Sequence, residues 1–173
     1  LKELKISAIQ VTIDGLEKVH NERRPHKQNN DSFQRIVHNL DDLFSVYPDI
    51  SIEFRVNVDK SNQSEYHRIY SYLKERYGKY SINIHPGYVT DDFSAESNGC
   101  CFEADEVNKF VLEQYDTHNI PISLYPRPIF GECCARHITS FVIGPEGELY
   151  KCWNDIGIPE KAIGNINLGD NYL

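Results

Sequence analysis

Ser51-Ile-Glu-Phe-Arg-Val-Asn-Val58 alternates polar and apolar side chains without interruption. Because successive side chains of a β-strand point to opposite faces, this alternation predicts a strand with one apolar and one polar face. A parallel strand buried on both faces would instead be almost wholly apolar. We therefore expect helices to pack on one side of this strand. Its other side would carry groups able to bind a polar ligand, namely Glu53, Arg55 and Asn57.

Two further segments show the same two-residue period. The first runs to Asp14, with Ile9, Val11 and Ile13 on one face and Gln10, Thr12 and Asp14 on the other. The other, Tyr80 to Ile84, has Ser81, Asn83 and His85 as its polar set. The sequence thus predicts three strands of the same two-faced kind.

Segments with helical spacing separate these strands. Asp31 and Gln34 stand at capping-box spacing before an apolar stripe that runs from Phe33 to Phe44. A second stripe runs from Tyr66 to Tyr77, and Gly78 is expected to end that helix. Strands that alternate with helices indicate a parallel α/β sheet. The alternative is a half-exposed antiparallel sheet.

The number of strand–helix units limits the fold. A complete (β/α) barrel of eight units needs about 200 to 250 residues, and this chain of 173 residues holds part of one. We predict an α/β fold in which residues 1–95 form part of a TIM-type barrel of parallel strands. Residues 96–130 would form a helix and a connector, and residues 131–173 a small segment with a β-hairpin around Gly144-Pro145-Glu146-Gly147. The helix is expected from about Asp105 to His118, with inward-facing Val107, Phe110, Val111 and Tyr115.

Composition and charge restrict the partners. The formal net charge is -8, and there is no stripe of Lys and Arg, which argues against nucleic acid as a partner. The apolar runs are too short for a transmembrane helix or a signal-peptide core, so we expect no membrane contact and a cytoplasmic location. The chain begins at Leu1 and contains no methionine. We expect it to be a fragment of a longer polypeptide, and the open edge of its partial barrel predicts a homodimer of the fragment.

Five cysteines occur as two adjacent pairs and a single residue: Cys100, Cys101, Cys133, Cys134 and Cys152. A secreted disulfide framework usually has an even, dispersed set, so thiols or metal ligands are favoured. Cys134 is followed by twelve residues, Gly147, four residues and Cys152, which could bring two thiolates to one metal through a tight hairpin. Both zinc and an iron–sulfur cluster accept such ligands.

This spacing resembles the C-x(9 to 15)-G-x4-C element that opens SPASM domains of radical S-adenosylmethionine (SAM) enzymes. The surrounding Ile143-Gly-Pro-Glu-Gly-Glu-Leu-Tyr-Lys-Cys152 and Ala162-Ile-Gly-Asn-Ile166 are also similar to that family. The resemblance implies that Cys134 and Cys152, with Cys133 beside them, help to hold an auxiliary 4Fe-4S cluster. The thiols of Cys134 and Cys152 would then lie close enough to share a metal.

A second resemblance lies upstream. Gln10-Val-Thr-Ile-Asp-Gly15, followed by His20, Arg23 and Arg24, looks like the fourth strand and following loop of radical SAM peptide-modifying enzymes. It implies that Thr12 and Arg24 contact the amino-acid part or the ribose of SAM. Asp14 stands at the same strand end, where barrel sites form. The segment from Arg55 to Asp59 resembles the fifth strand, which places Arg55 and Asn57 at the cofactor.

The residues alone leave other interpretations open. Arg24 could be a solvated side chain beside a capped strand end, and Arg55 with Asn57 could form a buried polar network that holds the barrel together. The resemblance favours ligand binding over these alternatives. We therefore expect Arg24 and Arg55 to serve the SAM pocket rather than the fold.

Two family elements are missing from this sequence. The C-x3-C-x2-C motif, which holds the SAM-cleaving cluster, does not occur, and neither does the later C-x2-C-x5-C-x3-C run. The resemblance implies that the whole enzyme generates a 5'-deoxyadenosyl radical and abstracts hydrogen from a bound peptide or protein. A ferredoxin or flavodoxin would act as reductant, and this chain alone would be inactive. The alternative is a non-catalytic zinc-binding or protein-interaction module held by Cys133, Cys134, Cys152 and either Cys100 or Cys101.

One position separates the chain from the anaerobic sulfatase-maturing enzymes that it resembles. In that family an Asp, proposed as the base, directly follows the C-x(9 to 15)-G-x4-C element. Here the position is Trp153, whose indole has a donor N–H and no basic site. Asp155, two residues further along an extended segment, would be too distant to substitute without a local bulge. The alternative is that Trp153 packs over the cluster while another group of the site acts as the base. We therefore expect that the whole enzyme does not mature sulfatases.

Overall fold

The computed structural model describes residues 5–89, 99–122 and 133–171. The chain divides into two compact units, Leu1–Tyr125 and Pro126–Leu173, and each is described by itself. None of the described helices has both the length and the apolar character needed to cross a membrane.

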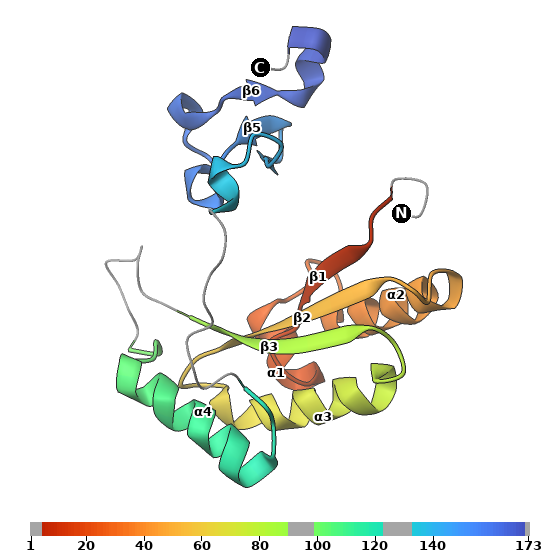
Figure 1. Ribbon diagram of the computed structural model, residues 1–173, viewed down its shortest axis with the longest axis vertical. Helices are drawn as coiled ribbons and strands as arrows, with labels where there is room; N and C mark the ends of the chain where they lie inside the picture. Colours follow the sequence, from red (N-terminus) through yellow and green to blue (C-terminus); the bar gives the residue numbers. More distant parts are fainter. Residues whose placement is uncertain (1–4, 90–98, 123–132, 172–173) are drawn as a thin grey trace. The chain divides into compact units, whose positions relative to one another are not determined.

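Unit 1 is built on a three-stranded parallel sheet in the order β1-β2-β3 (Figure 1). The strands are β1 (Ala8–Thr12), β2 (Ser51–Val58) and β3 (Ile82–Tyr88). Both pairings are parallel, as predicted, and the antiparallel alternative is wrong. The sequence defined β2 correctly. It extended β1 by two residues. It began β3 too early, at Tyr80, and ended it too early, at Ile84, whereas the strand continues through Pro86 at an edge where a missing N–H is tolerated.

The helices of unit 1 lie on one side of the sheet (Figure 1). They are α1 (Glu17–Arg23), α2 (Ser32–Val46), α3 (Tyr66–Tyr77) and α4 (Ala104–His118), with a 3-10 turn η1 (Gln63–Glu65) before α3. The apolar side chains of β2 are almost completely buried against them, including Phe54, whose ring packs on Tyr77 of α3. One face of the sheet therefore carries the core, as the alternating pattern predicts.

The N-terminus of α2 is capped differently from the prediction. Asp31 makes no capping hydrogen bond; its carboxylate accepts one from Arg35 instead. Asn21 of α1 supplies the cap, because its side-chain oxygen accepts hydrogen bonds from the Phe33 amide at 2.8 Å and from the Ser32 hydroxyl at 2.9 Å. The short helix α1, which the sequence did not reveal, thus fixes where α2 begins.

Helix α4 has the expected extent but a shifted inner face. Phe110 and Val111 are buried as predicted, whereas Tyr115 is 50% exposed and Gln114 takes the inward position. A capping box between Glu103 and Glu106 begins the helix. Neighbouring positions of a helix lie about 100° apart, so the rotation of α4 about its axis decides which of the two adjacent residues faces the core.

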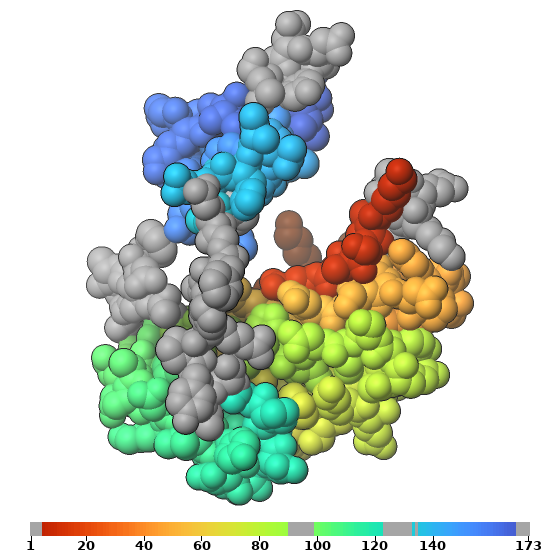
Figure 2. Space-filling view, viewed as in Figure 1, coloured from red at the N-terminus to blue at the C-terminus, as the bar shows by residue number. Residues whose placement is uncertain are grey.

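The opposite face of the sheet is polar along its length. Ser51 and Ser81 form a cross-strand hydroxyl pair at 3.0 Å, and Glu53 and Asn83 follow in register. In the described residues β1 and β3 pair only with β2, and no barrel closes. The yellow-green residues that include β3 lie on the visible surface of unit 1 (Figure 2).

Unit 2 contains a small antiparallel sheet in the order β4-β5-β6. Its strands are β4 (Val142–Ile143), β5 (Glu148–Tyr150) and β6 (Gly164–Asn165), and its 3-10 turns are η2 (Cys134–Arg136), η3 (Trp153–Asp155), η4 (Pro159–Lys161) and η5 (Ile166–Asn171). The hairpin predicted around Gly144-Pro145-Glu146-Gly147 is confirmed, since β4 and β5 pair antiparallel on either side of it. Gly147 has φ +86°, a conformation that favours glycine, and its amide donates to the Gly144 carbonyl at 3.1 Å.

Candidate functional site at the end of the parallel sheet

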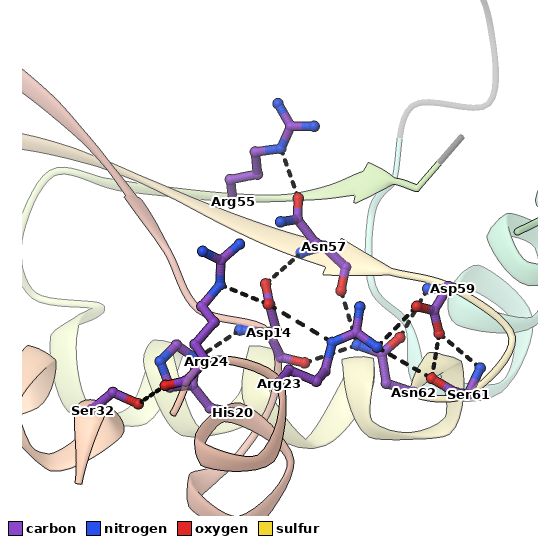
Figure 3. Close-up of polar contacts among 10 residues, drawn as sticks. All are labelled: Asp14, His20, Arg23, Arg24, Ser32, Arg55, Asn57, Asp59, Ser61 and Asn62. Atoms are coloured by element: carbon purple, nitrogen blue, oxygen red, sulfur yellow. Dashed lines mark hydrogen bonds and ion pairs between the residues drawn. The ribbon is translucent and has the colours of Figure 1, made fainter. Parts of the chain in front are cut away.

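Asp14 lies at the centre of a polar network where β1 and β2 end (Figure 3). It is 3% exposed, and one carboxylate oxygen accepts a hydrogen bond from Arg24 Nε at 2.7 Å. The other oxygen accepts from the Asn57 amide at 3.4 Å, while the amide of Asp14 donates to His20 Nδ1 at 3.1 Å. Asp14 therefore connects its own strand end with β2 and with the loop that carries the arginines.

Asn62 joins the segments that follow the two strands. Its side-chain nitrogen donates to the carbonyls of Asp14 and Asn57, both at 2.9 Å, and its oxygen accepts from the Asp59 amide at 2.8 Å. All the hydrogen-bonding groups involved come from loop or strand-end residues. This arrangement adds hydrogen bonds between the two strand ends to the apolar packing of Ile13 and Val58 beneath them.

Asp59 forms the second ion pair of the network. Arg23 Nη1 lies 2.9 Å from one of its carboxylate oxygens, and Ser61 donates to the other through its amide and its hydroxyl. Burial alone would raise the pKa of Asp59, but the hydrogen bonds from Ser61 and the pairing with Arg23 lower it below the ordinary value. Asp59 is therefore a carboxylate at neutral pH and fixes the position of Arg23.

His20 is completely buried beside Asp14. Because its Nδ1 accepts a hydrogen bond, the neutral ring carries its proton on Nε2, which has no partner among the described residues. Burial lowers the pKa of His20; the charge of Asp14 opposes that shift and the charge of Arg24 adds to it. His20 is therefore a neutral support for the strand end and not a proton carrier at neutral pH.

Arg55 lies across the neighbouring strand at Gly87. Its Nε donates to Asn57 Oδ1 at 2.9 Å. A Cβ atom at Gly87 would lie 2.8 Å from that same Asn57 oxygen and would clash with Arg55 Nε itself. The absence of a side chain at Gly87 thus gives the guanidinium its path over β3.

The terminal nitrogens of Arg24 and Arg55 make no hydrogen bond with any described residue, and in Figure 3 both guanidinium ends point away from the helices. Thr12 and His85 are in register with Arg55 on the two neighbouring strands. Guanidinium groups bind carboxylates through paired N–H donors. The chemistry of this donor set therefore fits a polar ligand that carries a carboxylate and hydroxyl groups.

The five residues that the sequence proposed for cofactor binding, Thr12, Asp14, Arg24, Arg55 and Asn57, do gather at this end of the sheet. Their roles differ. The carboxylate of Asp14 and the amide oxygen of Asn57 are already engaged within the network, so they orient the arginines. Thr12, Arg24 and Arg55 remain as the groups that can face a ligand. Arg24 also has a structural partner in Asp14, which the sequence did not indicate.

The structure places the predicted metal ligands only in part. In unit 2, Cys133 is exposed and Cys152 is half-buried. The side chain of Cys134 falls outside what the structure describes, so the predicted approach of its sulfur to Cys152 does too. The described residues contain no group of three or more His, Cys, Asp or Glu side chains that could hold a metal ion. Thiols are suitable ligands for zinc or iron, but the described thiols of unit 2, Cys133 and Cys152, are fewer than the four ligands such sites need.

The segment after Cys152 is not extended, contrary to the expectation for Asp155. Residues Trp153–Asp155 form the 3-10 turn η3, and Asp155 pairs with Lys161 at 2.6 Å. The hydrogen bond to Asp155 raises the pKa of Lys161. Trp153 is 67% exposed. The carboxylate of Asp155 is thus engaged by a cation.

Cys100 belongs to unit 1, where its carbonyl accepts a hydrogen bond from the Lys60 amide at 2.9 Å. That contact places the backbone of Cys100 beside the loop that follows β2. Sequence reasoning did not single out Asn62, Asp59 or Gly87, whose roles depend on which loops and strands become neighbours.

Comparisons with protein-family models, with curated proteins and with solved structures find no match to this chain.

Proposed function

We propose that this chain is part of a radical SAM enzyme that modifies a peptide or protein, and that the end of its parallel sheet contributes to the SAM pocket. The observation that carries the proposal is the pair of guanidinium ends of Arg24 and Arg55, which share the polar side of the sheet and lack partners among the described residues. The methionine part of SAM carries a carboxylate that such donors would bind.

The two faces of the sheet support the same proposal. Helices cover the apolar face, while the other face carries Ser, Glu, Asn, Arg and His side chains. A closed TIM barrel with a packed interior would need mainly branched apolar residues there. A polar face suits part of a wider (β/α) barrel whose lumen holds a ligand, and we propose that residues of unit 1 form such a part.

In this arrangement each residue has a distinct task. Arg24 and Arg55 hold the carboxylate, Thr12 offers a hydroxyl, and Asp14 and Asn57 keep the two guanidinium groups in place. Bound at a reduced iron–sulfur cluster, SAM supplies the radical that abstracts hydrogen from the substrate. The sequence lacks the motif for that cluster, which would come from the rest of the enzyme. The cysteines of unit 2 would contribute to an auxiliary 4Fe-4S cluster, with a ferredoxin or flavodoxin as reductant in the cytoplasm.

The direct test measures SAM affinity of the whole enzyme by calorimetry, using Arg55→Ala and Arg55→Lys. Loss of paired N–H donors should weaken SAM binding at least tenfold in Arg55→Ala, with Arg55→Lys in between. Arg35→Ala is the matched control, because Arg35 is a surface arginine paired with Asp31. Equal SAM affinity in all four proteins would contradict the proposal.

A second function, a zinc-binding module, is favoured by the composition of unit 2. Its described buried hydrophobic residues are Leu149 and Tyr150, a core too small to stabilise most domains by itself. A structural metal held by Cys133, Cys134 and Cys152 would supply the missing stability. Anaerobic reconstitution distinguishes the two: a brown protein with visible absorbance supports an iron–sulfur cluster, and colourless stoichiometric zinc supports the module.

A further inference from the structure

The register of the hairpin determines which residue lies opposite Cys152. Val142 pairs with Tyr150 and Ile143 with Leu149. Continuing this antiparallel register outward places Lys151 opposite Phe141 and Cys152 opposite Ser140, not opposite Cys134. Position 140 lies six positions after 134, and in an extended strand that stretch would span roughly 20 Å. A straight hairpin would therefore keep the two cysteines apart.

The chain does not continue straight beyond β4. The amide of Arg136 donates to the Cys133 carbonyl at 2.8 Å, and the amide of Ser140 donates to the His137 carbonyl at 3.1 Å. Two consecutive turns thus compact residues 133–140, which we call the cysteine turn. This folding shortens the path from Cys134 to the hairpin.

Lys151 binds the cysteine turn from the opposite strand. Its ammonium donates to the carbonyls of His137 at 2.6 Å, Ser140 at 2.9 Å and Ile138 at 3.3 Å. It also lies 4.5 Å from the centre of the Phe141 ring. An ammonium group has three N–H donors, so all of them are used by one short segment. Among the described residues no carboxylate pairs with Lys151.

We propose that Lys151 is a positioning residue that holds the cysteine turn against the strand carrying Cys152, so that the thiols of unit 2 can bind one metal. This inference rests on the proposed function, in which those cysteines are metal ligands. Lys151 immediately precedes Cys152, so its contacts act on the backbone at that position. Neutral or shorter side chains cannot make three hydrogen bonds to the carbonyls, and the cysteine turn would then separate from β5.

Thiol cross-linking tests the positioning without any metal. Reduced, metal-free protein is treated with dibromobimane, and the Cys134–Cys152 cross-link is quantified by mass spectrometry after digestion. We expect the cross-linking rate to fall at least tenfold in Lys151→Met. Lys109→Met is the control, because Lys109 is an exposed lysine of α4, outside unit 2, that pairs with Asp105, and its rate should equal that of the wild type. Equal rates in all three proteins would overturn the inference.

Cobalt provides the second readout. Co²⁺ bound by thiolates has a charge-transfer absorption, and its intensity and the Co²⁺ affinity should fall in Lys151→Met but not in Lys109→Met. If wild-type protein binds no Co²⁺ and assembles no cluster, the proposed metal function fails, while a loss of cross-linking in Lys151→Met would still uphold the positioning role. If Lys151→Met binds Co²⁺ as the wild type does, the inference fails.

A folding control is needed because unit 2 is small. The Gly144 amide donates to the Glu148 carbonyl at 2.8 Å, so its hydrogen exchange reports whether the hairpin persists. Lys151→Gln keeps fewer donors than lysine and should give an intermediate cross-linking rate with the hairpin intact. If the Gly144 amide of Lys151→Met is no longer protected from hydrogen exchange, the cross-linking rate of Lys151→Gln decides. A rate equal to that of the wild type would contradict the proposal, and a reduced rate would support it.

Discussion

The two units are stabilised in different ways. Unit 1 buries the apolar face of β2 under helices, with Ile52, Phe54 and Val58 fully covered. Unit 2 buries Leu149 and Tyr150, while Ile143, Trp153 and Leu168 are exposed. Its described contacts are mainly polar, such as the Lys151 bonds and those from two asparagine side chains to the Glu146 carbonyl. The comparison teaches that the first unit rests mainly on a buried apolar core, whereas the described part of the second rests mainly on hydrogen bonds.

The largest effect should come from the core of unit 1. Phe54→Ala removes a fully buried ring that stacks on Tyr77 and should lower the free energy of unfolding by about 3–5 kcal/mol. In unit 2, Trp153→Ala removes an exposed side chain and should change the free energy of unfolding by less than about 0.5 kcal/mol. Denaturant titration measures both. A loss of comparable size in Trp153→Ala would show that unit 2 has a larger core than the contrast implies.

A smaller effect should separate the two arginines of the site. Arg24→Ala leaves a buried carboxylate without its 2.7 Å donor and should cost about 1–3 kcal/mol, with Arg23 Nε still 3.8 Å away. Arg55 bonds only to the neutral amide of Asn57 among the described residues, so Arg55→Ala should cost at most about 1 kcal/mol. Thermal unfolding with both variants checks the order. The reverse order would make Arg55 the structural residue and Arg24 the one free for a ligand.

Acidification should weaken unit 1 through His20. Its pKa in the folded protein is lowered from 6.5 by burial, so the unfolded chain takes up a proton first as the pH falls. The stabilisation is present above pH 6.5 and is lost progressively below it, down to the lowered pKa. His20→Gln keeps an acceptor for the Asp14 amide but does not titrate, so its melting temperature should fall less between pH 7.5 and 5.5. Part of the pH dependence of the melting temperature will remain in His20→Gln, because burial also lowers the pKa of His67.

The smallest signal is expected from sulfatase maturation. The position after Cys152 is an exposed indole, and Asp155 is paired with Lys161, so no described group next to Cys152 is placed to accept the proton. We expect no formylglycine above background when the whole reconstituted enzyme receives a sulfatase-motif peptide, SAM and reductant. Mass spectrometry of the peptide decides, and efficient conversion of its Cys or Ser would require a base from another part of the site.

The sequence was sufficient where a pattern is local. Alternation over Ser51–Val58 predicted β2 and its two faces, and the spacing around Gly147 predicted a hairpin. The sequence did not predict the features that depend on contacts between segments distant along the chain. The α2 cap comes from Asn21, eleven positions before the first residue of the helix, and Asp31 had the right residue type in the wrong conformation. The choice between Gln114 and Tyr115 depends on the rotation of α4 against the core.

In the candidate site, too, the sequence revealed local patterns but not the contacts between distant segments. The polar residues of β1 and β2 could be found from the strand pattern, because parallel strands end at the same edge of a sheet. The role of Asn62 could not, since it requires the loops after both strands to be neighbours. The distance between Cys134 and Cys152 along the chain likewise says nothing of their register, which leaves six residues to be folded back.

The path of Arg55 over Gly87 has an evolutionary consequence. A side chain at position 87 and the present course of the arginine are sterically incompatible, since a Cβ there would meet both Arg55 and Asn57. A side chain at position 87 should therefore be accepted only where position 55 no longer carries an arginine on this course. In homologous chains we expect an arginine at position 55 to be accompanied by glycine at position 87.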